Sequence, residues 1–309
     1  MPNNSNTENK RASGIICINK ASGMTSHDVV NRLRRLYNTK KVGHTGTLDP
    51  MATGLLIVLV GNAVKASEYL MGGNKSYIAG LQLGMTSDTE DISGNITSRC
   101  ETLPKKEEVL AVCKKFVGDI MQIPPMYSAI KIGGKKLVDI ARSGETIDRD
   151  PRPITIHSLE CRAVNEESGN YLLKIECSKG TYIRTLCADI GAALLCGGLM
   201  SSLKRENNCG FSLDHSHTLE ELEELSVEER ENLLIPIDKA FGDYTPLNLT
   251  PHHAGLARNG VRLFTSKVAP NSSEMENFRL YESGKFFALA QVQKNNEGDS
   301  VLRVLKQFI

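Results

Sequence analysis

The chain has 309 residues, of which 40% are hydrophobic, and its formal net charge is +1. This composition predicts a soluble globular protein with one large domain and a small companion. The eight cysteines form no CxxC or CxC pair, so we expect reduced thiols in the cytoplasm and no zinc or redox motif. No apolar run reaches the ~18 residues of a membrane span. The polar start lacks the apolar core of a signal peptide, and we predict a disordered tail over residues 1–13.

The charge is unevenly distributed along the chain. Residues 1–49 contain eight Lys or Arg against three acids, whereas residues 204–243 contain four bases against eleven acids. This asymmetry is compatible with a cationic face toward phosphates and an acidic helix that faces away from it. Charge alone favours the simpler interpretation of a mixed surface.

The N-terminal segment predicts a strand and then an amphipathic helix. The strand covers 14–19, and Thr25 with Asp28 forms a capping box for the helix. The apolar residues on one face of this helix are Val29, Val30, Leu33 and Leu36. Arg32 and Arg35 lie on the other face, which therefore points toward solvent or phosphate.

The segment GHTGTLDPMATGLL, residues 43–56, presents a single carboxylate, Asp49, on the edge of a core strand. The apolar run 55–60 has strand length and β-branched character, so we expect it to be buried in a sheet. The three glycines, Gly43, Gly46 and Gly54, permit positive φ and close backbone approach. An isolated Asp-Pro is usually a turn or helix-cap residue. Three glycines and three threonines in fourteen positions favour a surface that receives a ligand.

Hydrophobic periodicity predicts a mixture of helices and strands beyond this segment. We expect helices over 63–70, 104–117 and 218–234, a helix that opens at Thr181, and strands over 75–84, 154–163 and 171–177. Residues 86–94 are predicted to be loop. The stretch 123–152 mixes Pro-Pro, Gly-Gly and Lys-Lys with short apolar pieces, which indicates a semi-mobile insertion. Short strands, starting with LTPHHAGLARNGVRLF, predict a small β-rich domain over 245–309.

Several motifs in order carry a resemblance to a known family. They are Lys20 before a glycine turn, GHTGTLDPMATGLL, KSYIAGLQLG, IPPMYSAIKIGGKKL, GTYIRTL and SLKRENNCGF. Read together, they resemble the TruB family of bacterial-type tRNA pseudouridine synthases from about residue 14 to 241.

This resemblance implies an α+β pseudouridine synthase fold with a long, mostly antiparallel central sheet flanked by helices. It implies a catalytic domain over 14–243, a mobile RNA-clamping insertion over 123–152, and a PUA-like RNA-binding domain over 245–309. The implied reaction is an isomerisation of uridine 55 in the T loop of tRNA to pseudouridine, without metal or other cofactor. The implied protein is a cytoplasmic monomer that binds the T arm of tRNA, with no membrane and no obligate protein partner.

The resemblance also assigns three catalytic residues. Asp49 matches the catalytic aspartate, which must be ionised to act as a nucleophile or as a base toward the ribose, and both roles remain open. Arg184 matches the arginine partner, which favours the charged form of that carboxylate. Tyr77 matches the active-site tyrosine, whose ring can stack on an extruded uracil. Without the resemblance, Arg184 reads as an exposed helix arginine and Tyr77 as a half-buried strand tyrosine.

A second group of residues is assigned to substrate binding. Its members are His44, Lys20, Gly46, Thr47, Leu203 and Tyr182. His44 would fill space beside the base with a flat ring, Lys20 would brace the aspartate loop or meet phosphate, and Leu203 would form an apolar wall of the uracil pocket.

Two further basic residues have two possible roles each, and three positions depart from the family pattern. Lys65 and Arg205 are compatible with a contact to the RNA backbone and with a surface charge. Ala21, Val138 and Glu206 depart from the residues common in the family, which are proline, tyrosine and threonine. None of these departures touches the three catalytic residues, so we expect activity to survive.

Two other functions compete with the enzyme. The first is a tRNA-binding or tRNA-folding module in which catalysis is dispensable, favoured by the basic segments and the C-terminal domain. The second is a small-molecule enzyme that binds phosphate, which lacks support because neither GxGxxG nor GxxxxGK[ST] occurs. The paired histidines, His215, His217, His252 and His253, have no metal-ligand spacing, so no metal site is predicted.

Overall fold

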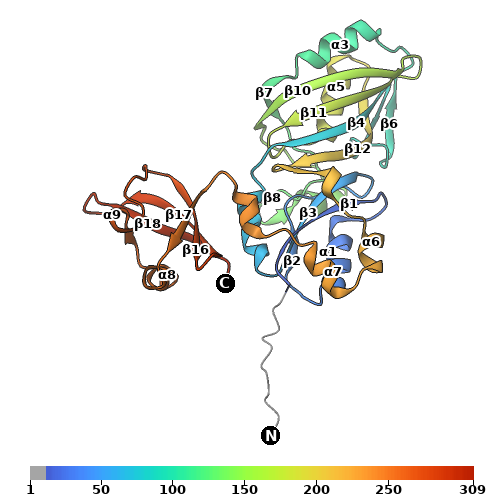
Figure 1. The fold of residues 1–309 in the computed structure, drawn as a ribbon. Helices are drawn as coiled ribbons and strands as arrows, with labels where there is room; N and C mark the ends of the chain where they lie inside the picture. Colours follow the sequence, from blue (N-terminus) through green and yellow to red (C-terminus); the bar gives the residue numbers. More distant parts are fainter. Residues whose placement is uncertain (1–11) are drawn as a thin grey trace.

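The computed structural model describes residues 12–309, and two sheets dominate its architecture (Figure 1). The predicted disordered tail therefore lies outside the described residues, except for its last two positions. The larger sheet belongs to the predicted catalytic domain, and the smaller one belongs to the C-terminal region. No helix in the described part of the chain is long and apolar enough to cross a membrane.

The larger sheet is long and mostly antiparallel, as predicted. Its central path runs β1 (Gly14–Lys20), β3 (Thr53–Val60), β12 (Gly198–Asn208), β4 (Lys75–Leu83), β11 (Asn170–Cys177), β10 (Arg152–Asn165) and β7 (Gly118–Gln122). Two short strands extend it, β2 (Val42–His44) beside β3 and β13 (Phe211–Ser212) beside β12. The β3–β12 pair is parallel, and the other pairs are antiparallel. The predicted apolar run forms β3, whose residues Gly54–Val60 are all buried.

Helices cover this sheet in two groups (Figure 1). α3 (Lys106–Lys114) and α5 (Ile183–Ala193) lie beside β10 and β12, and α1 (Ser26–Leu36) lies beside β2. The predicted capping box of α1 is confirmed, because Thr25 and Asp28 exchange hydrogen bonds at its start. The predicted helix 63–70 is a 3₁₀ turn, Gly61–Ala66, followed by α2 (Ser67–Leu70).

The acidic helix predicted over 218–234 is two short helices. α6 (Leu219–Glu224) ends before an extended residue, and α7 (Val227–Asn232) starts afresh. Ser226 caps α7, because its hydroxyl accepts from the Glu229 N–H while the Glu229 carboxylate accepts from the Ser226 N–H. A second capping box inside one helical pattern therefore interrupts the helix.

The acidic segment also does not face away from the basic helix. Arg32 on α1 contacts Glu220 at 3.1 Å and Glu223 at 2.7 Å on α6. At this point the contacts fit the mixed surface that charge alone favours, and not the alternative of a cationic face separate from an acidic helix, because opposite charges on α1 and α6 meet. Arg32 is consequently occupied by protein carboxylates.

Two connections, one after β4 and one after β7, contain short helices or strands. Residues 86–94, predicted to be loop, lie in the hairpin of β5 (Met85–Ser87) and β6 (Ile96–Arg99) and are mostly turn. The insertion 123–152 contains a hairpin of β8 (Lys131–Ile132) and β9 (Lys135–Lys136), followed by α4 (Leu137–Arg142). Apart from the buried Leu137, all residues from 131 to 150 are exposed or half-exposed.

The C-terminal region is β-rich, as predicted. Its sheet runs β14 (Thr245–Leu249), β16 (Asn277–Glu282), β17 (Lys285–Lys294), β18 (Ser300–Gln307) and β15 (Leu263–Phe264), with α9 (Thr265–Val268) beside it. The stretch after Leu249, predicted to be a strand, is instead the helix α8 (Pro251–Arg258). Thr250 caps this helix, and Pro251 occupies its first turn. Proline is tolerated there because the backbone N–H that it lacks would have no acceptor within the helix.

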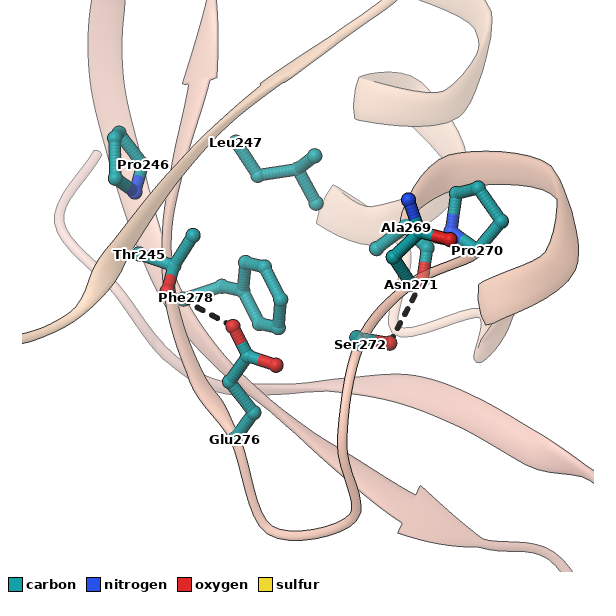
Figure 2. Close-up of a pocket in the computed structure, with 9 residues that line it drawn as sticks. All are labelled: Thr245, Pro246, Leu247, Ala269, Pro270, Asn271, Ser272, Glu276 and Phe278. Carbon is teal, nitrogen blue, oxygen red and sulfur yellow. Dashed lines mark hydrogen bonds between the residues drawn. The ribbon is translucent and has the colours of Figure 1, made fainter.

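A pocket of about 260 Å³ opens on the β14 side of this region (Figure 2). Phe278 and Leu247 form its apolar floor, and the loop 269–272 forms the opposite wall. The Glu276 carboxylate at its rim accepts from the Thr245 hydroxyl at 2.9 Å. The pocket thus carries an acid that is already bonded within the protein. A PUA-like identity for this region stays a prediction.

Candidate active site

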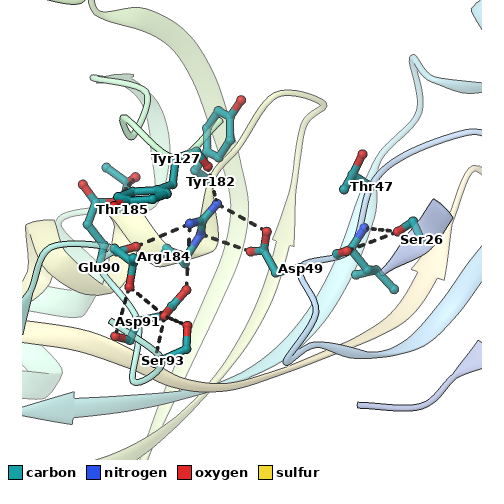
Figure 3. Close-up of polar contacts among 12 residues, drawn as sticks. Ser26, Thr47, Asp49, Glu90, Asp91, Ser93, Tyr127, Tyr182, Arg184 and Thr185 are labelled. Atoms are coloured by element: carbon teal, nitrogen blue, oxygen red, sulfur yellow. Dashed lines mark hydrogen bonds and ion pairs between the residues drawn. The ribbon is translucent and has the colours of Figure 1, made fainter. Parts of the chain in front are cut away.

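Asp49 lies in the connection from β2 to β3, and the residues on both sides of it are anchored. The Ser26 hydroxyl on α1 accepts from the Leu48 N–H at 2.9 Å and donates to the Leu48 carbonyl at 3.1 Å. The carbonyl of Pro50 accepts from the Gly23 N–H at 2.9 Å. The Asp49 side chain itself keeps 30% of its surface exposed. The structure therefore presents the carboxylate from a fixed backbone, as the sequence predicts (Figure 3).

Lys20 braces this connection from inside the protein. It is fully buried at the end of β1, and its ammonium donates to the carbonyls of Ala21 at 2.9 Å, Met24 at 2.8 Å and Pro50 at 3.2 Å. Burial lowers the pKa of Lys20 to about 8, although the nearby Asp49 carboxylate opposes the shift. Of the two predicted roles, the arrangement fits the brace, because a fully buried ammonium offers no surface to an RNA phosphate.

Of the three glycines around Asp49, only Gly54 occupies a position that requires glycine. It has a φ of +94°, and a Cβ there would lie 2.3 Å from the backbone oxygen of Arg205. Gly43 and Gly46 are not among the residues with positive φ, and a Cβ on either would meet only ordinary contacts. Of the three glycines, which all permit positive φ and close backbone approach, only Gly54 therefore uses both.

Arg184 forms a two-point ion pair with Asp49. It occupies the first turn of α5, and its Nε and Nη2 lie 3.0 and 3.4 Å from the two Asp49 carboxylate oxygens. Its side chain is 8% exposed, so this pair is shielded from solvent on the arginine side. The Nη2 also donates to the carbonyl of Tyr127 at 3.0 Å, in the insertion. The predicted Asp49–Arg184 partnership is present in the structure.

A second carboxylate, Asp91, lies on the other side of the same guanidinium (Figure 3). Its Oδ2 is 3.8 Å from Arg184 Nη1, and its side chain is only 5% exposed. The hydroxyl of Thr89 at 2.8 Å and the N–H of Ser93 at 2.9 Å donate to its Oδ1. Sequence reasoning missed this residue, which fell in the predicted loop 86–94. An acid followed two residues later by Ser, in the motif DTEDISG, was the available signal.

Burial and neighbouring charges compete at the Asp49 carboxyl. Burial raises the pKa of Asp49 above its ordinary value, and the Arg184 guanidinium opposes this effect without cancelling it. The Asp91 carboxylate adds to the rise, whereas the Lys20 ammonium lowers the pKa. The guanidinium thus acts in the predicted direction, but desolvation is the larger effect.

Tyr77 and Leu203 lie on the two strands beside the Asp49 connection. Tyr77 is 6% exposed on β4, directly across from Arg205 on β12, and Leu203 is 8% exposed across from Ala79. Burial raises the pKa of Tyr77, so its hydroxyl keeps its proton. Stacking by Tyr77 and wall formation by Leu203 stay predictions.

Arg205 fits neither of its two predicted roles. It is 1% exposed, so it is not a surface charge, and its guanidinium faces carbonyls of this chain. It donates to the carbonyls of Leu55 at 2.7 Å, Gly46 at 3.1 Å and Thr47 at 3.5 Å. Sequence alone gave no signal for this contact, because an arginine on a strand is usually exposed at one face of the sheet.

The remaining predicted binding residues surround this centre. The half-buried His44 accepts from the Gly46 N–H at 3.3 Å through Nδ1, and burial and Arg205 lower its pKa, which favours the neutral ring. Thr47 is exposed. The half-buried Tyr182 precedes α5, and its backbone N–H and carbonyl bond with the side-chain amide of Gln122 at 2.8 and 3.0 Å. Among residues 12–309, no cluster of three side chains could hold a metal ion.

Together these contacts build one site from distant segments. Asp49 contacts Arg184 directly. Arg205 contacts the carbonyls of Gly46 and Thr47 in the same connection and pairs with Tyr77 across the β4–β12 contact. An anchored carboxylate with one open edge can attack a carbon or remove a proton from a bound substrate.

Comparisons with known proteins place the chain in a family. The model of the TruB family pseudouridylate synthase N-terminal domain matches residues 34–183, and that of the tRNA pseudouridylate synthase B C-terminal domain matches residues 184–242. The protein named tRNA pseudouridine synthase B from Alkaliphilus oremlandii is 40% identical over 95% of this chain and 97% of its own length. The protein of the same name from Clostridium kluyveri is 39% identical over 96% and 99%.

A solved structure shows the same fold. The chain in the crystal structure of a Cbf5-Nop10-Gar1 complex aligns with a TM-score of 0.71 at 23% identity, over 96% of this chain and 85% of that one. This similarity covers both sheets and shows the fold alone. Because the sequence similarity extends over nearly the whole length of the relatives, the chain belongs to the TruB family of pseudouridylate synthases.

Proposed function

We propose that the protein isomerises a uridine in the T loop of tRNA, uridine 55, to pseudouridine, with Asp49 as the catalytic carboxylate. The observation that carries this proposal is the partly exposed Asp49 carboxylate, which the buried Arg184 holds in a two-point ion pair. Relatives that carry the name tRNA pseudouridine synthase B support the substrate class. The protein is thus proposed to be an isomerase of the intramolecular transferase type.

The reaction needs an ionised carboxylate beside the ribose. The bond from ribose C1′ to uracil N1 breaks, the uracil turns within the site, and C1′ joins C5, which then loses its proton while N1 regains one. No atom is gained or lost overall. Asp49 could attack C1′ or remove a ribose proton, and both need the charged form that Arg184 favours.

The surrounding residues would hold the extruded base. An enzyme that acts on a base within folded RNA must take that base out of its stack. Tyr77 and Leu203 would contact the uracil, and the neutral ring of His44 would occupy space near it. Thr47, which is exposed, and Gly46, where a side chain has room, would face the RNA.

The outer surface would bind the T arm. We infer that the insertion clamps the RNA with its exposed basic residues and that the C-terminal region is a PUA-like RNA-binding domain. The insertion's basic residues are Lys131, Lys135, Lys136, Arg142, Arg149 and Arg152. The cysteines in the structure are free, which supports action in the cytoplasm, and we propose that a monomer suffices.

The substitution Asp49→Asn tests the function. It keeps the shape of the side chain and removes its charge, so pseudouridine formation on a T-arm stem-loop should be lost while RNA affinity changes little. Single-turnover assays with excess enzyme and a stem-loop whose target uridine is replaced by cytidine give the background. Normal turnover by this variant contradicts the proposal. If Asp49→Asn restores every phenotype of a deletion, the tRNA-folding module is the better function.

A further inference from the structure

Arg205 is a buried cation without a buried anion to pair with. It is the largest of the side chains that are fully buried in the structure, and it lies in the middle of β12. Within the part of the chain that the structure describes, no carboxylate lies within ion-pair distance of it. Burying a guanidinium is unfavourable unless hydrogen bonds compensate. Such a residue therefore has a specific set of partners.

Those partners are backbone carbonyls on both sides of Asp49. The Nε donates to Leu55, just downstream, while Nη2 and Nη1 donate to Gly46 and Thr47, just upstream. Every guanidinium nitrogen thus has an acceptor in the backbone that carries the catalytic carboxylate. The planar fork of arginine can serve two chain segments at once, whereas the ammonium of lysine is a compact point charge.

The backbone of Arg205 is fixed by the same segment. Arg205 pairs with Gly54 in the parallel β3–β12 contact and with Tyr77 in the antiparallel β4–β12 contact. A Cβ on Gly54 would lie 2.3 Å from the Arg205 oxygen and 2.9 Å from its nitrogen, so glycine is required for this approach. Side chain and backbone of Arg205 consequently hold the start of β3 and the residues before Asp49 together.

We propose that Arg205 is a positioning residue for the isomerisation, which sets the location of the Asp49 carboxylate by clamping the carbonyls of Gly46, Thr47 and Leu55. It acts through the backbone and does not touch the substrate. This inference rests on the proposed function, because it needs Asp49 to be the reacting group. A displacement of about 1 Å in a reacting group can lower a rate about 100-fold.

The test compares Arg205→Lys and Arg205→Met with Lys204→Met as the matched control. Lys204 is the neighbour of Arg205 on β12 and is exposed, so Lys204→Met removes the same charge from the outer face of the strand. Thermal unfolding identifies the temperature at which each variant is folded. Single-turnover pseudouridine formation at saturating enzyme is then measured there, together with the Kd for the stem-loop.

We expect the single-turnover rate of both Arg205 variants to fall about 100-fold while the Kd changes less than about threefold, and Lys204→Met to keep the wild-type rate. A merely structural role would lower the folded fraction and leave the rate of the folded protein unchanged. A folded Arg205→Lys or Arg205→Met protein with a rate within about threefold of wild type overturns the proposal.

Hydrogen exchange provides a readout that does not depend on activity. If Arg205 clamps the connection, Arg205→Lys should raise amide exchange over residues 43–54 more than in the rest of the larger sheet. Unchanged exchange there overturns the proposal even if the enzyme is inactive for another reason. If neither the wild type nor Asp49→Asn forms pseudouridine on the stem-loop, the proposed function fails, and with it the role of Arg205 in catalysis. Hydrogen exchange then still tests whether Arg205 clamps the connection.

Discussion

Two segments reach the same guanidinium, and they are built in opposite ways. The aspartate loop, residues 43–54, meets Arg184 with the Asp49 carboxylate and is held by two buried cations, Lys20 and Arg205. The insertion, residues 123–152, meets Arg184 only with the backbone carbonyl of Tyr127 and is largely exposed. The proposed chemistry, which needs accurate placement, thus lies on the anchored segment, and the proposed RNA contacts, which tolerate adjustment, lie on the exposed one.

This difference predicts two kinds of defect. Changes at the aspartate loop and its partners should lower the rate of the bound complex. Changes in the exposed insertion should weaken RNA binding and leave that rate intact. The following substitutions test this separation, in order of decreasing effect.

Arg184→Met should have the largest effect, because it removes the residue that both segments contact. Loss of a buried group that stabilises charge commonly lowers a rate by about 100- to 1,000-fold, and we expect a single-turnover loss of this size. Arg162→Met, which removes an exposed arginine on β10, is the control and should turn over normally. A loss seen mainly in Kd would place Arg184 with the RNA-binding surface, contrary to its proposed role in the rate of the bound complex.

Asp91→Asn should have an intermediate effect. Its carboxylate is 5% exposed and supports the side of Arg184 that faces away from Asp49. Removing a hydrogen-bonding charge of this kind costs about 1.5–3 kcal/mol, which corresponds to a rate loss of about 10- to 100-fold if Arg184 moves with it. The single-turnover rate measures this directly. Asp88→Asn, in the same hairpin but more exposed, should show no comparable loss.

The double substitution Lys135→Ala/Lys136→Ala tests the insertion. Both side chains are exposed on β9, and if each neutralises one phosphate, the slope of log K against log salt should fall by about 2. The measurements are Kd for the stem-loop at several salt concentrations and the rate at saturation. An unchanged Kd with a reduced rate would show that the insertion helps to assemble the catalytic pair through Tyr127 and does not act in RNA binding alone.

The sequence predicted most of the anchored segment, because its signals are local. The apolar run of β3 is continuous, the capping box joins Thr25 to Asp28, and Asp49 stands only a few positions before β3. The family motifs added Arg184, which lies 135 positions from Asp49 along the chain. No local pattern marks a buried arginine such as Arg205, since its partners lie about 160 positions away and become neighbours only when β12 joins β3.

Two helices were predicted wrongly because local capping signals were given too little weight against the average pattern of the segment. The stretch after Thr250 contains His-His, glycine and alanine, and its cap and Pro251 start a helix in place of the predicted strand. The predicted acidic helix carried two capping boxes, and the second one at Ser226 ends the first helix. In both segments the start signal determined the element more strongly than the average propensity.

The smallest expected effect is a shift in pH dependence, and it separates the two segments without relying on the size of a rate loss. The proposed role of Asp49 needs its ionised form, so the rate should rise with pH through the pKa of Asp49, which burial places above the ordinary aspartate value. The negative charge of Asp91 raises that pKa further. Asp91→Asn removes the charge, so the low-pH part of its profile should move to lower pH although its plateau rate falls. The Lys135→Ala/Lys136→Ala protein should keep the wild-type midpoint, because its changes lie on the exposed hairpin. Single-turnover rates across acidic pH, at saturating enzyme, measure these midpoints, and a shift of the Asp91→Asn midpoint to higher pH would contradict the electrostatic role of Asp91 at this carboxylate.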